Sequence, residues 1–246
     1  MSSQNNRVAL VTGGARGIGA GIVERLVADG ARVAFTYASN QIVADELVER
    51  LTASGGEVLA IRADSSSTVD ISRAVEATVA RFERLDILVN SAGRYVFGPL
   101  AEMPDEEIDT MIDLNVRGTV TATRSALTHL TRGGRIINIG STNADTNPFP
   151  GGSIYALTKG AIASFSRGLS GELAPLGITI NTVQPGPVHT EGNPDDGPMA
   201  DFVRGFIPSG RFGTVGEVAS LVSYLASEES GHITGTSIAV DGGMSA

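Results

Sequence analysis

Residues Val8–Gly19 read VALVTGGARGIG, so a glycine-rich turn follows directly on a short apolar run. Glycine at Gly13, Gly17 and Gly19 allows a tight turn, the close approach of a pyrophosphate and close packing of a helix on the strand. The helix that starts in this turn offers an anion unpaired N–H groups and the positive end of its dipole. A strand, a glycine turn and a helix in this order therefore predict a site for the pyrophosphate of a dinucleotide. A purely structural turn is the alternative.

Short β-branched runs alternate with longer amphipathic stretches along the rest of the chain. They predict strands at 8–11, 33–36, 58–61, 87–89, 136–139, 178–181 and 237–240, and helices near 17–29, 41–54, 68–82, 105–131, 153–174 and 215–226. Most of these strands are apolar almost throughout, as in a parallel sheet that is covered on both faces. We therefore expect an α/β fold in a single domain, residues 1–246. Its core would be a Rossmann-type, doubly wound parallel sheet of about seven strands with helices on both faces.

Composition narrows the possible partners. The 246 residues include 18 basic and 27 acidic side chains, which gives a net charge of −9. Nucleic acids and anionic membranes require a basic face, so we expect neither as a partner. The chain has no cysteine, and its three histidines lack the spacing of metal ligands, so we expect neither a disulfide nor a metal site. No apolar run approaches the roughly 20 residues of a membrane span. Residues 1–7 lack the apolar part of a secretory signal, which predicts a cytoplasmic protein.

One long segment breaks the alternation of strands and helices. From Pro185 to Arg211 the chain is rich in glycine and proline and has little regular periodicity. Connections are usually about 4–6 residues long, and longer ones are often functional. The apolar side chains of this segment include Met199, Phe202 and Phe206, which favours a covering helix over a disordered excursion. We therefore predict a substrate lid at about 187–211.

The glycine turn, read as Thr-Gly-x-x-x-Gly-x-Gly, is followed by four further motifs. These are Asn90-Ser91-Ala92-Gly93, Asn115, Ser141 with Tyr155-x-x-x-Lys159, and Pro185-Gly186-Pro187-Val188-His189-Thr190. In this order and at these spacings, over nearly the whole chain, the set resembles the short-chain dehydrogenase/reductase family. The family usually has Asn-Asn-Ala-Gly in the second motif, so Ser91 is a minor departure. The resemblance implies a catalytic tetrad of Asn115, Ser141, Tyr155 and Lys159.

The resemblance also implies a nicotinamide dinucleotide cofactor. Its expected binding residues are Gly13, Arg16, Gly17, Ile18, Gly19, Tyr37, Ala38, Ser39, Asp64, Ser65, Asn90, Ala92, Gly93, Tyr155, Lys159, Pro185, Gly186, Val188 and Thr190. In NAD-binding units an acidic residue near the end of the second strand accepts the ribose hydroxyls. Residues 37–40 contain no carboxylate that would repel a 2′-phosphate, and Arg16 is placed to offer its guanidinium to that phosphate. We therefore expect NADP(H), with a solvated Arg16 as the alternative. Asp64 resembles the residue that meets the adenine, or it caps a helix.

Tyr155 and Lys159 stand four residues apart in a predicted helix and therefore share one face. A phenol normally titrates near pH 10, and a nearby ammonium lowers that pKa. The phenol could then donate a proton to a carbonyl oxygen as hydride reaches the carbon, or accept it in the reverse reaction. Ser141 follows a strand and is expected to hold the substrate oxygen; a turn-forming serine is the alternative. The resemblance gives Asn115 a water-holding role next to Lys159, and a buried asparagine that satisfies backbone groups is the alternative.

The loops that should contact substrate are apolar and carry few charges. They contain Tyr95, Asn143, Phe149, Phe202 and Phe206, together with Phe97. A neutral ketone or aldehyde is therefore the expected substrate, and the predicted activity is that of an NADPH-dependent carbonyl reductase. Relatives of this kind are commonly homotetramers, which we expect here.

Two other functions stay open. In 3-oxoacyl-[acyl-carrier-protein] reductases basic residues dock an acidic carrier; Arg132 resembles one of them, but Leu176 stands at the other position. The net charge of −9 adds repulsion toward such a carrier. Residues 184–187, 193–194, 197–199 and 241–243 resemble a bacterial subgroup that includes a cyclic-dinucleotide-binding biofilm dispersal mediator. Under that hypothesis the reductase machinery is secondary to a regulatory ligand. An inactive scaffold would require a broken tetrad.

Overall fold

The computed structural model describes residues 4–246. Residues 1–3, part of the N-terminal segment considered above for a secretory signal, lie outside the described part. Seven parallel strands form one sheet in the order β3-β2-β1-β4-β5-β6-β7. They are β1 (Val8–Thr12), β2 (Arg32–Tyr37), β3 (Val58–Arg62), β4 (Ile87–Asn90), β5 (Arg135–Ile139), β6 (Thr179–Pro185) and β7 (Ser237–Val240). The expected doubly wound parallel sheet is confirmed.

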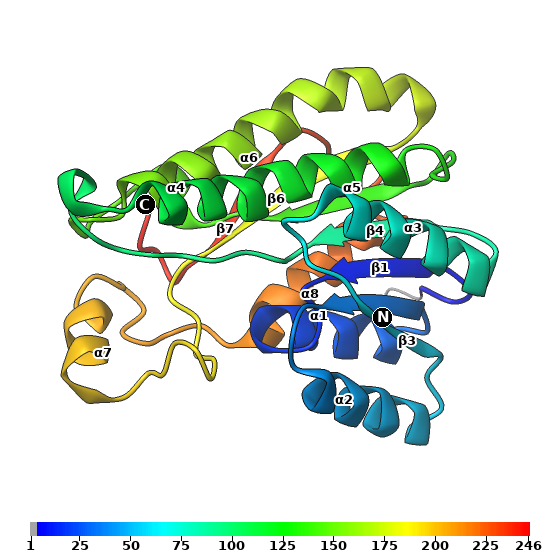
Figure 1. Cartoon of the computed structure of the whole chain (residues 1–246), viewed down its shortest axis with the longest axis horizontal. Helices are drawn as coiled ribbons and strands as arrows, with labels where there is room; N and C mark the ends of the chain where they lie inside the picture. Colours follow the sequence, from blue (N-terminus) through cyan, green and yellow to red (C-terminus); the bar gives the residue numbers. More distant parts are fainter. Residues whose placement is uncertain (1–3) are drawn as a thin grey trace.

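Helices cover both faces of this sheet (Figure 1). α1 (Gly17–Ala28), α2 (Gln41–Ala53) and α8 (Val215–Ala226) pack on one face; α3 (Thr68–Phe82), α5 (Gly118–Ala126) and α6 (Ser153–Leu173) pack on the other. The central strand β1 shows how the sequence encodes this. Ala9 and Val11 point into the first core, and Val8 and Leu10 point into the second. Because both faces are buried, the strand is apolar throughout instead of alternating.

The helix expected over 105–131 has a different form. α4 (Asp105–Ile112) passes into a π-helical segment, Asp113–Arg117, which leads directly into α5. After Ala126 the chain leaves the helix in tight turns, and Leu130 enters the core. The expected helix was therefore too long at its C-terminal end. Its apolar pattern gave no sign of the wider turn at 113–117.

The strand order reverses beside β1, which lies between β2 and β4. In open parallel sheets such a switch point is where ligands bind, beyond the carboxyl ends of the strands. The long segment after β6 contains the expected helix, α7 (Gly197–Arg204). In Figure 1, α7 stands apart from the helices that cover the sheet. Its Ala200 packs with Ile207, Phe212 and Met244 in a small core of its own. Within residues 4–246, no helix combines the length and apolar character needed to cross a membrane.

Candidate active site

A cleft of about 630 Å³ lies at the switch point of the sheet. It is bordered by the glycine turn after β1, the ends of β2 and β3, residues 91–95 after β4, and residues 190–193. Most of the expected cofactor residues line it: Gly13, Arg16, Gly17, Ile18, Gly19, Tyr37, Ala38, Ser39, Asp64, Ser65, Ala92, Gly93 and Thr190. The cleft has the size of an ordinary small-molecule site.

Hydrogen bonds to two threonine hydroxyls fix the glycine turn and the loop next to it. Thr36 Oγ1 accepts a hydrogen bond from the Gly13 N–H at 3.0 Å. Thr12 Oγ1 accepts from the N–H groups of Ser91 and Ala92, each at 3.1 Å, and so ties the loop after β4 to the turn after β1. Gly13 has a φ of +65°, and a Cβ on it would lie 2.8 Å from the Cα of Ala92. Only glycine fits this position.

The N-terminus of α1 faces the cleft without a cap. Its N-cap residue is Arg16, whose side chain makes no capping hydrogen bond. The first N–H groups of a helix have no partner within the helix, and the helix dipole adds positive charge there. The turn therefore presents donors to an anion in the cleft.

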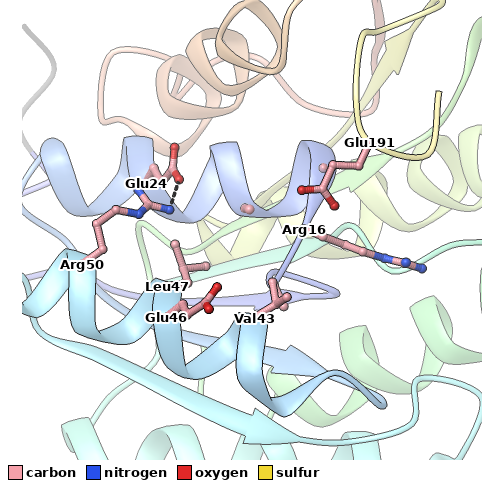
Figure 2. A pocket seen from close by; sticks show the side chains of 10 residues that line it. Arg16, Glu24, Val43, Glu46, Leu47, Arg50 and Glu191 are labelled. Carbon is pink, nitrogen blue, oxygen red and sulfur yellow. Dashed lines mark hydrogen bonds and ion pairs between the residues drawn. The ribbon is translucent and has the colours of Figure 1, made fainter. Parts of the chain in front are cut away.

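Arg16 is exposed and borders both the cleft and a smaller hollow of about 310 Å³ between α1 and α2. Figure 2 shows its guanidinium pointing away from the neighbouring pair Glu24–Arg50, whose ion pair is 2.7 Å long. Within residues 4–246 Arg16 itself forms no ion pair. β2 ends at Tyr37, and the following Asn40 caps α2 by accepting from the Val43 N–H at 3.3 Å. This end of the cleft thus has a free guanidinium and no carboxylate from residues 37–40.

Asp64 lines the cleft but does not cap a helix. Its Oδ1 accepts from the N–H and the hydroxyl of Ser66 at 2.9 and 2.7 Å, so it closes its own turn. Ser67 is the N-cap of α3, with its hydroxyl accepting from the Asp70 N–H. The capping alternative for Asp64 was wrong, because the N-cap of α3 is Ser67, three residues later.

The other six expected cofactor residues are not among its lining: Tyr155 and Lys159, described below, and Asn90, Pro185, Gly186 and Val188. Asn90 is buried and donates to Asn138 Oδ1 at 2.7 Å and to Thr123 Oγ1 at 3.3 Å. Pro185 ends β6, and Val188 is 4% exposed with its side chain in the core. Asn90, Pro185 and Val188 are therefore packed at the carboxyl end of the sheet and do not line the open cleft.

Tyr155 and Lys159 come from α6, one turn apart, as expected. Lys159 is the only lysine of the chain. It is 6% exposed, and its Nζ donates to the carbonyl of Ile139 at 2.8 Å, at the end of β5. Burial lowers the pKa of Lys159 to about 8. Its Nζ lies 5.7 Å from the centre of the Tyr155 ring.

The expected lowering of the Tyr155 pKa is not what the structure gives. Burial raises the pKa of Tyr155, and nearby Tyr95 adds to this effect, while a hydrogen bond with Ser141 acts in the opposite direction. The ammonium of Lys159 donates to a backbone carbonyl and stands off the phenol ring. Desolvation of the phenolate therefore outweighs the hydrogen bond with Ser141, and the pKa of Tyr155 rises.

Ser141 lies two residues past β5 and connects Tyr155 to a short polar chain. Its hydroxyl donates to Asn143 Oδ1 at 3.2 Å and accepts from the Asn143 N–H at 3.2 Å. The Asn143 amide in turn donates to Asn147 Oδ1 at 2.9 Å. Asn143, an expected substrate residue, therefore orients the serine and the loop beyond it.

Asn115 sits in the π-helical segment and is 2% exposed. Its Oδ1 accepts from the Arg94 N–H at 2.9 Å, and its Nδ2 donates to the Arg94 carbonyl at 2.8 Å and to Thr158 Oγ1 at 3.0 Å. This is the role weighed above as the alternative for Asn115: a buried amide that satisfies backbone groups. It fixes the loop after β4 against α6, next to Lys159.

The expected substrate residues form two groups of aromatic rings. Tyr95 lines the cleft and contacts Tyr155, with ring centres 6.1 Å apart. Phe149 contacts Phe202 and Phe206, at 6.1 and 5.2 Å. The second group lies outside the lining of the cleft.

Several residues of the site were not foreseen. Thr36 and Thr12 hold the turn, and the cleft is also lined by Ala15, Asn40, Val43, Ala63, Ser91, Arg94, Leu114, Glu191, Gly192 and Asn193. The available signal was a threonine at or next to the end of a strand, Thr12 in β1 and Thr36 in β2, since a hydroxyl there is placed to satisfy the backbone of a nearby turn. Within the described residues no cluster of three or more His, Cys, Asp or Glu side chains is arranged to hold a metal ion.

Comparison with known proteins agrees with this geometry. The chain matches the family model described as Enoyl-(Acyl carrier protein) reductase over residues 13–245. The cyclic-di-GMP-binding biofilm dispersal mediator protein of Escherichia coli strain K12 is 39% identical over 246 residues, which cover 100% of both chains. A short-chain dehydrogenase/reductase of Serratia marcescens is 46% identical with a TM-score of 0.97, over 98% of this chain and 99% of that one. A short chain dehydrogenase of Burkholderia cenocepacia in complex with NADP is 41% identical with a TM-score of 0.96, over 98% and 99% of the two chains. The chain therefore belongs to the short-chain dehydrogenase/reductase family of oxidoreductases.

Proposed function

We propose that the protein is an NADPH-dependent reductase that transfers hydride to a ketone or aldehyde, with Tyr155 as the proton donor, and that the reaction is reversible, with NADP+ as the hydride acceptor when the alcohol is oxidised. The observation that supports this most directly is the grouping of Tyr155, Ser141 and Lys159 at the end of β5. A tyrosine hydroxyl bonded to a serine, with a buried lysine one turn away, provides a proton donor and a second hydroxyl for one carbonyl oxygen.

The cofactor is NADP(H), as in the Burkholderia relative. The turn is tight enough to require glycine, because a Cβ on Gly13 would meet Ala92 and one on Gly19 would meet the Gly13 carbonyl. The uncapped N-terminus of α1 in this turn suits a pyrophosphate. The unpaired guanidinium of Arg16 and the absence of a carboxylate in residues 37–40 suit a 2′-phosphate. When bound, NADPH supplies the hydride for the reduction.

The chain's own groups handle the proton and the substrate oxygen. In the proposed reaction, the Tyr155 O–H donates its proton to the carbonyl oxygen as the carbon is reduced. Ser141 would donate its single O–H to the same oxygen in place of Asn143 Oδ1, while the Asn143 N–H, which donates to Ser141 Oγ, keeps the serine oriented. Lys159, buried behind Tyr155, favours the phenolate that remains while its amine is protonated. Asn115 keeps the loop after β4 in place beside them.

Residues 187–211 act as the lid in this proposal. Two observations support it: Tyr95 Oη donates to the Gly192 carbonyl at 3.0 Å, and α7 has a small core separate from the main sheet. Movement of this lid would break the Tyr95–Gly192 hydrogen bond, the contacts of Phe202 and Phe206 with Phe149, and the bond from the Ser209 N–H to the Gly242 carbonyl. A homotetrameric assembly is part of the same proposal.

The test is the change Tyr155→Phe, assayed by NADPH consumption with a panel of ketones, aldehydes, diketones and a 3-oxoacyl thioester. We expect kcat to fall by a factor of about 100 to 10,000, because the transferable proton is removed. The dissociation constant for NADPH should stay unchanged, since the ring remains. Near-full activity of the variant would exclude Tyr155 as the proton donor. Preferred turnover of the thioester would favour the acyl-carrier-protein function.

A regulatory role is the second candidate, favoured by the full-length match to the cyclic-di-GMP-binding protein of Escherichia coli. Titration of the protein with cyclic-di-GMP, with and without NADPH, separates the two. Saturable binding together with no turnover on any carbonyl would favour regulation. Turnover of a carbonyl compound without binding of cyclic-di-GMP would support the reductase function and exclude the regulatory role.

A further inference from the structure

Half of the Phe and Tyr rings of the chain lie in two clusters, one of which contains the proposed proton donor, Tyr155. The sequence has eight phenylalanines, four tyrosines and no tryptophan. Tyr95, Phe97 and Tyr155 form one cluster, with ring centres 6.0 to 6.1 Å apart and the two tyrosine rings edge to face. A second cluster is formed by Phe149, Phe202 and Phe206, at 5.2 to 6.1 Å. We call the second group the phenylalanine cluster.

The two clusters border one another. The Gly98 N–H donates to the Gly151 carbonyl at 3.1 Å, so the loops that carry Phe97 and Phe149 lie side by side. A Cβ on Gly152 would lie 2.9 Å from the edge of the Phe97 ring. Phe149 is two residues before Gly151, so the Cα atoms of these two residues lie within about 8 Å of one another. The phenylalanine cluster therefore continues the aromatic surface from Tyr155 outward, toward α7.

Most of these rings are open to solvent. Tyr95 is 52% exposed, Phe97 44%, Phe202 57% and Phe206 41%, whereas the core rings Phe35 and Phe82 are at most 1% exposed. Exposed apolar surface that gathers in one patch marks a binding site, because leaving it in water is unfavourable. The patch is continuous with the hydroxyl that acts on the carbonyl, so the group that covers it belongs to the substrate.

The geometry of the phenylalanine cluster favours a particular kind of group. Phe149 and Phe202 each lie nearly perpendicular to Phe206, with interplanar angles of 80° and 72°. The cluster therefore presents both ring faces and ring edges. A further aromatic ring gains face-to-edge attraction there, beyond the area that it buries, while a saturated group gains only the area.

We propose that the substrate is a carbonyl compound with an aryl substituent, and that Phe149, Phe202 and Phe206 hold this aryl ring while Tyr155 acts on the carbonyl. The proposal rests on the proposed reductase function and narrows its substrate class. It also makes the phenylalanine cluster a specificity determinant, shared between the loop after β5 and α7.

The test uses two ketones that differ only in aromaticity: 4-phenyl-2-butanone and 4-cyclohexyl-2-butanone. We expect kcat/KM of the wild type to be about tenfold higher for the phenyl compound. In Phe202→Leu and Phe206→Leu, which keep an apolar side chain, the preference should fall to about twofold or less, because kcat/KM falls more for the phenyl compound than for the cyclohexyl compound. Phe202→Tyr should retain the preference. Tyr224→Leu removes an exposed ring of α8 outside both clusters and should leave both values as in the wild type.

The outcomes separate this inference from the function beneath it. A wild-type preference of onefold or less, or an equal loss for both ketones in the leucine variants, would overturn the aryl assignment and leave the reductase standing. An equal loss would show that the cluster only closes the lid. No turnover of any carbonyl by protein that binds NADPH would overturn the reductase function, and the aryl assignment with it. Thermal unfolding of each variant verifies that the rates refer to folded protein.

Discussion

Replacing Asn115 by alanine should destabilise the protein measurably without touching its sheet. The side chain makes three hydrogen bonds: two with the backbone of Arg94 and one with Thr158. Each is worth about 1 kcal/mol net, so Asn115→Ala should lower the free energy of unfolding by about 3 kcal/mol. For a chain of this size, each kcal/mol shifts Tm by roughly 2–4 °C, which predicts a fall of roughly 6–12 °C. Asn115→Asp keeps the acceptor for the Arg94 N–H and loses both donated bonds, so about 2 kcal/mol should be lost.

Urea unfolding followed by far-ultraviolet circular dichroism measures these differences. Asn147→Ala is the matched control, because its amide accepts a single bond at the surface and should change stability by less than about 0.5 kcal/mol. If Asn115→Ala behaves like this control, the amide does not hold the loop after β4 and our interpretation of its contacts is wrong. A large loss of kcat in a variant with unchanged stability would instead favour the water-holding role next to Lys159 that the family resemblance implies.

Three further changes probe the cofactor end, the buried amine and the space between them. Arg16→Ala should raise KM for NADPH about tenfold and leave KM for NADH nearly unchanged; an equal rise for both would remove Arg16 from phosphate recognition. Burial lowers the pKa of Lys159 from 10.5 to about 8, so between these pH values the unfolded chain holds a proton that the folded chain has released. The free energy of unfolding should therefore gain about 3 kcal/mol from this group as pH rises from 8 to 10.5, and urea titrations of Lys159→Met should lack that gain. A Cβ on Gly93 would lie 3.3 Å from Asn115 Oδ1 and 3.4 Å from Lys159 Nζ, so Gly93→Ala should lower kcat several-fold at nearly constant stability, which paired kinetic and thermal measurements can verify.

The fold was predictable because its signals are local. An apolar run such as Val8–Val11 is buried on both faces, and that alone favours a parallel sheet between two layers of helices. The end of β6 was not predictable in this way. Thr182 and Gln184 are polar, yet both are buried, and Thr182 Oγ1 donates to Ser166 Oγ on α6 at 2.8 Å. The partner on α6 satisfies the buried hydroxyl of Thr182, and periodicity along the chain does not reveal that partner.

The candidate site divides in the same way. Motif spacing brought Tyr155, Ser141 and Lys159 together correctly, since strand ends and helix turns fix their positions. The predicted lowering of the Tyr155 pKa was wrong. Burial of the phenol raises this pKa, and that burial depends on how the loop around Tyr95 packs, which the sequence alone does not show. The same holds for the contact between Phe149 and α7, which joins segments some fifty residues apart.

The solitary lysine gives the protein a built-in reporter. Lys159 is the only lysine of the chain and is 6% exposed. Isotope labelling of lysine therefore gives side-chain signals from this one buried residue of the candidate site, and they need no further assignment. Their chemical shifts would follow cofactor loading and the titration near pH 8 directly. Reagents that acylate amines provide a second, slower measurement on the same side chain. The folded protein shields this amine, so the fraction of Lys159 that is acylated over time, measured by mass spectrometry, reports how often the structure around α6 opens.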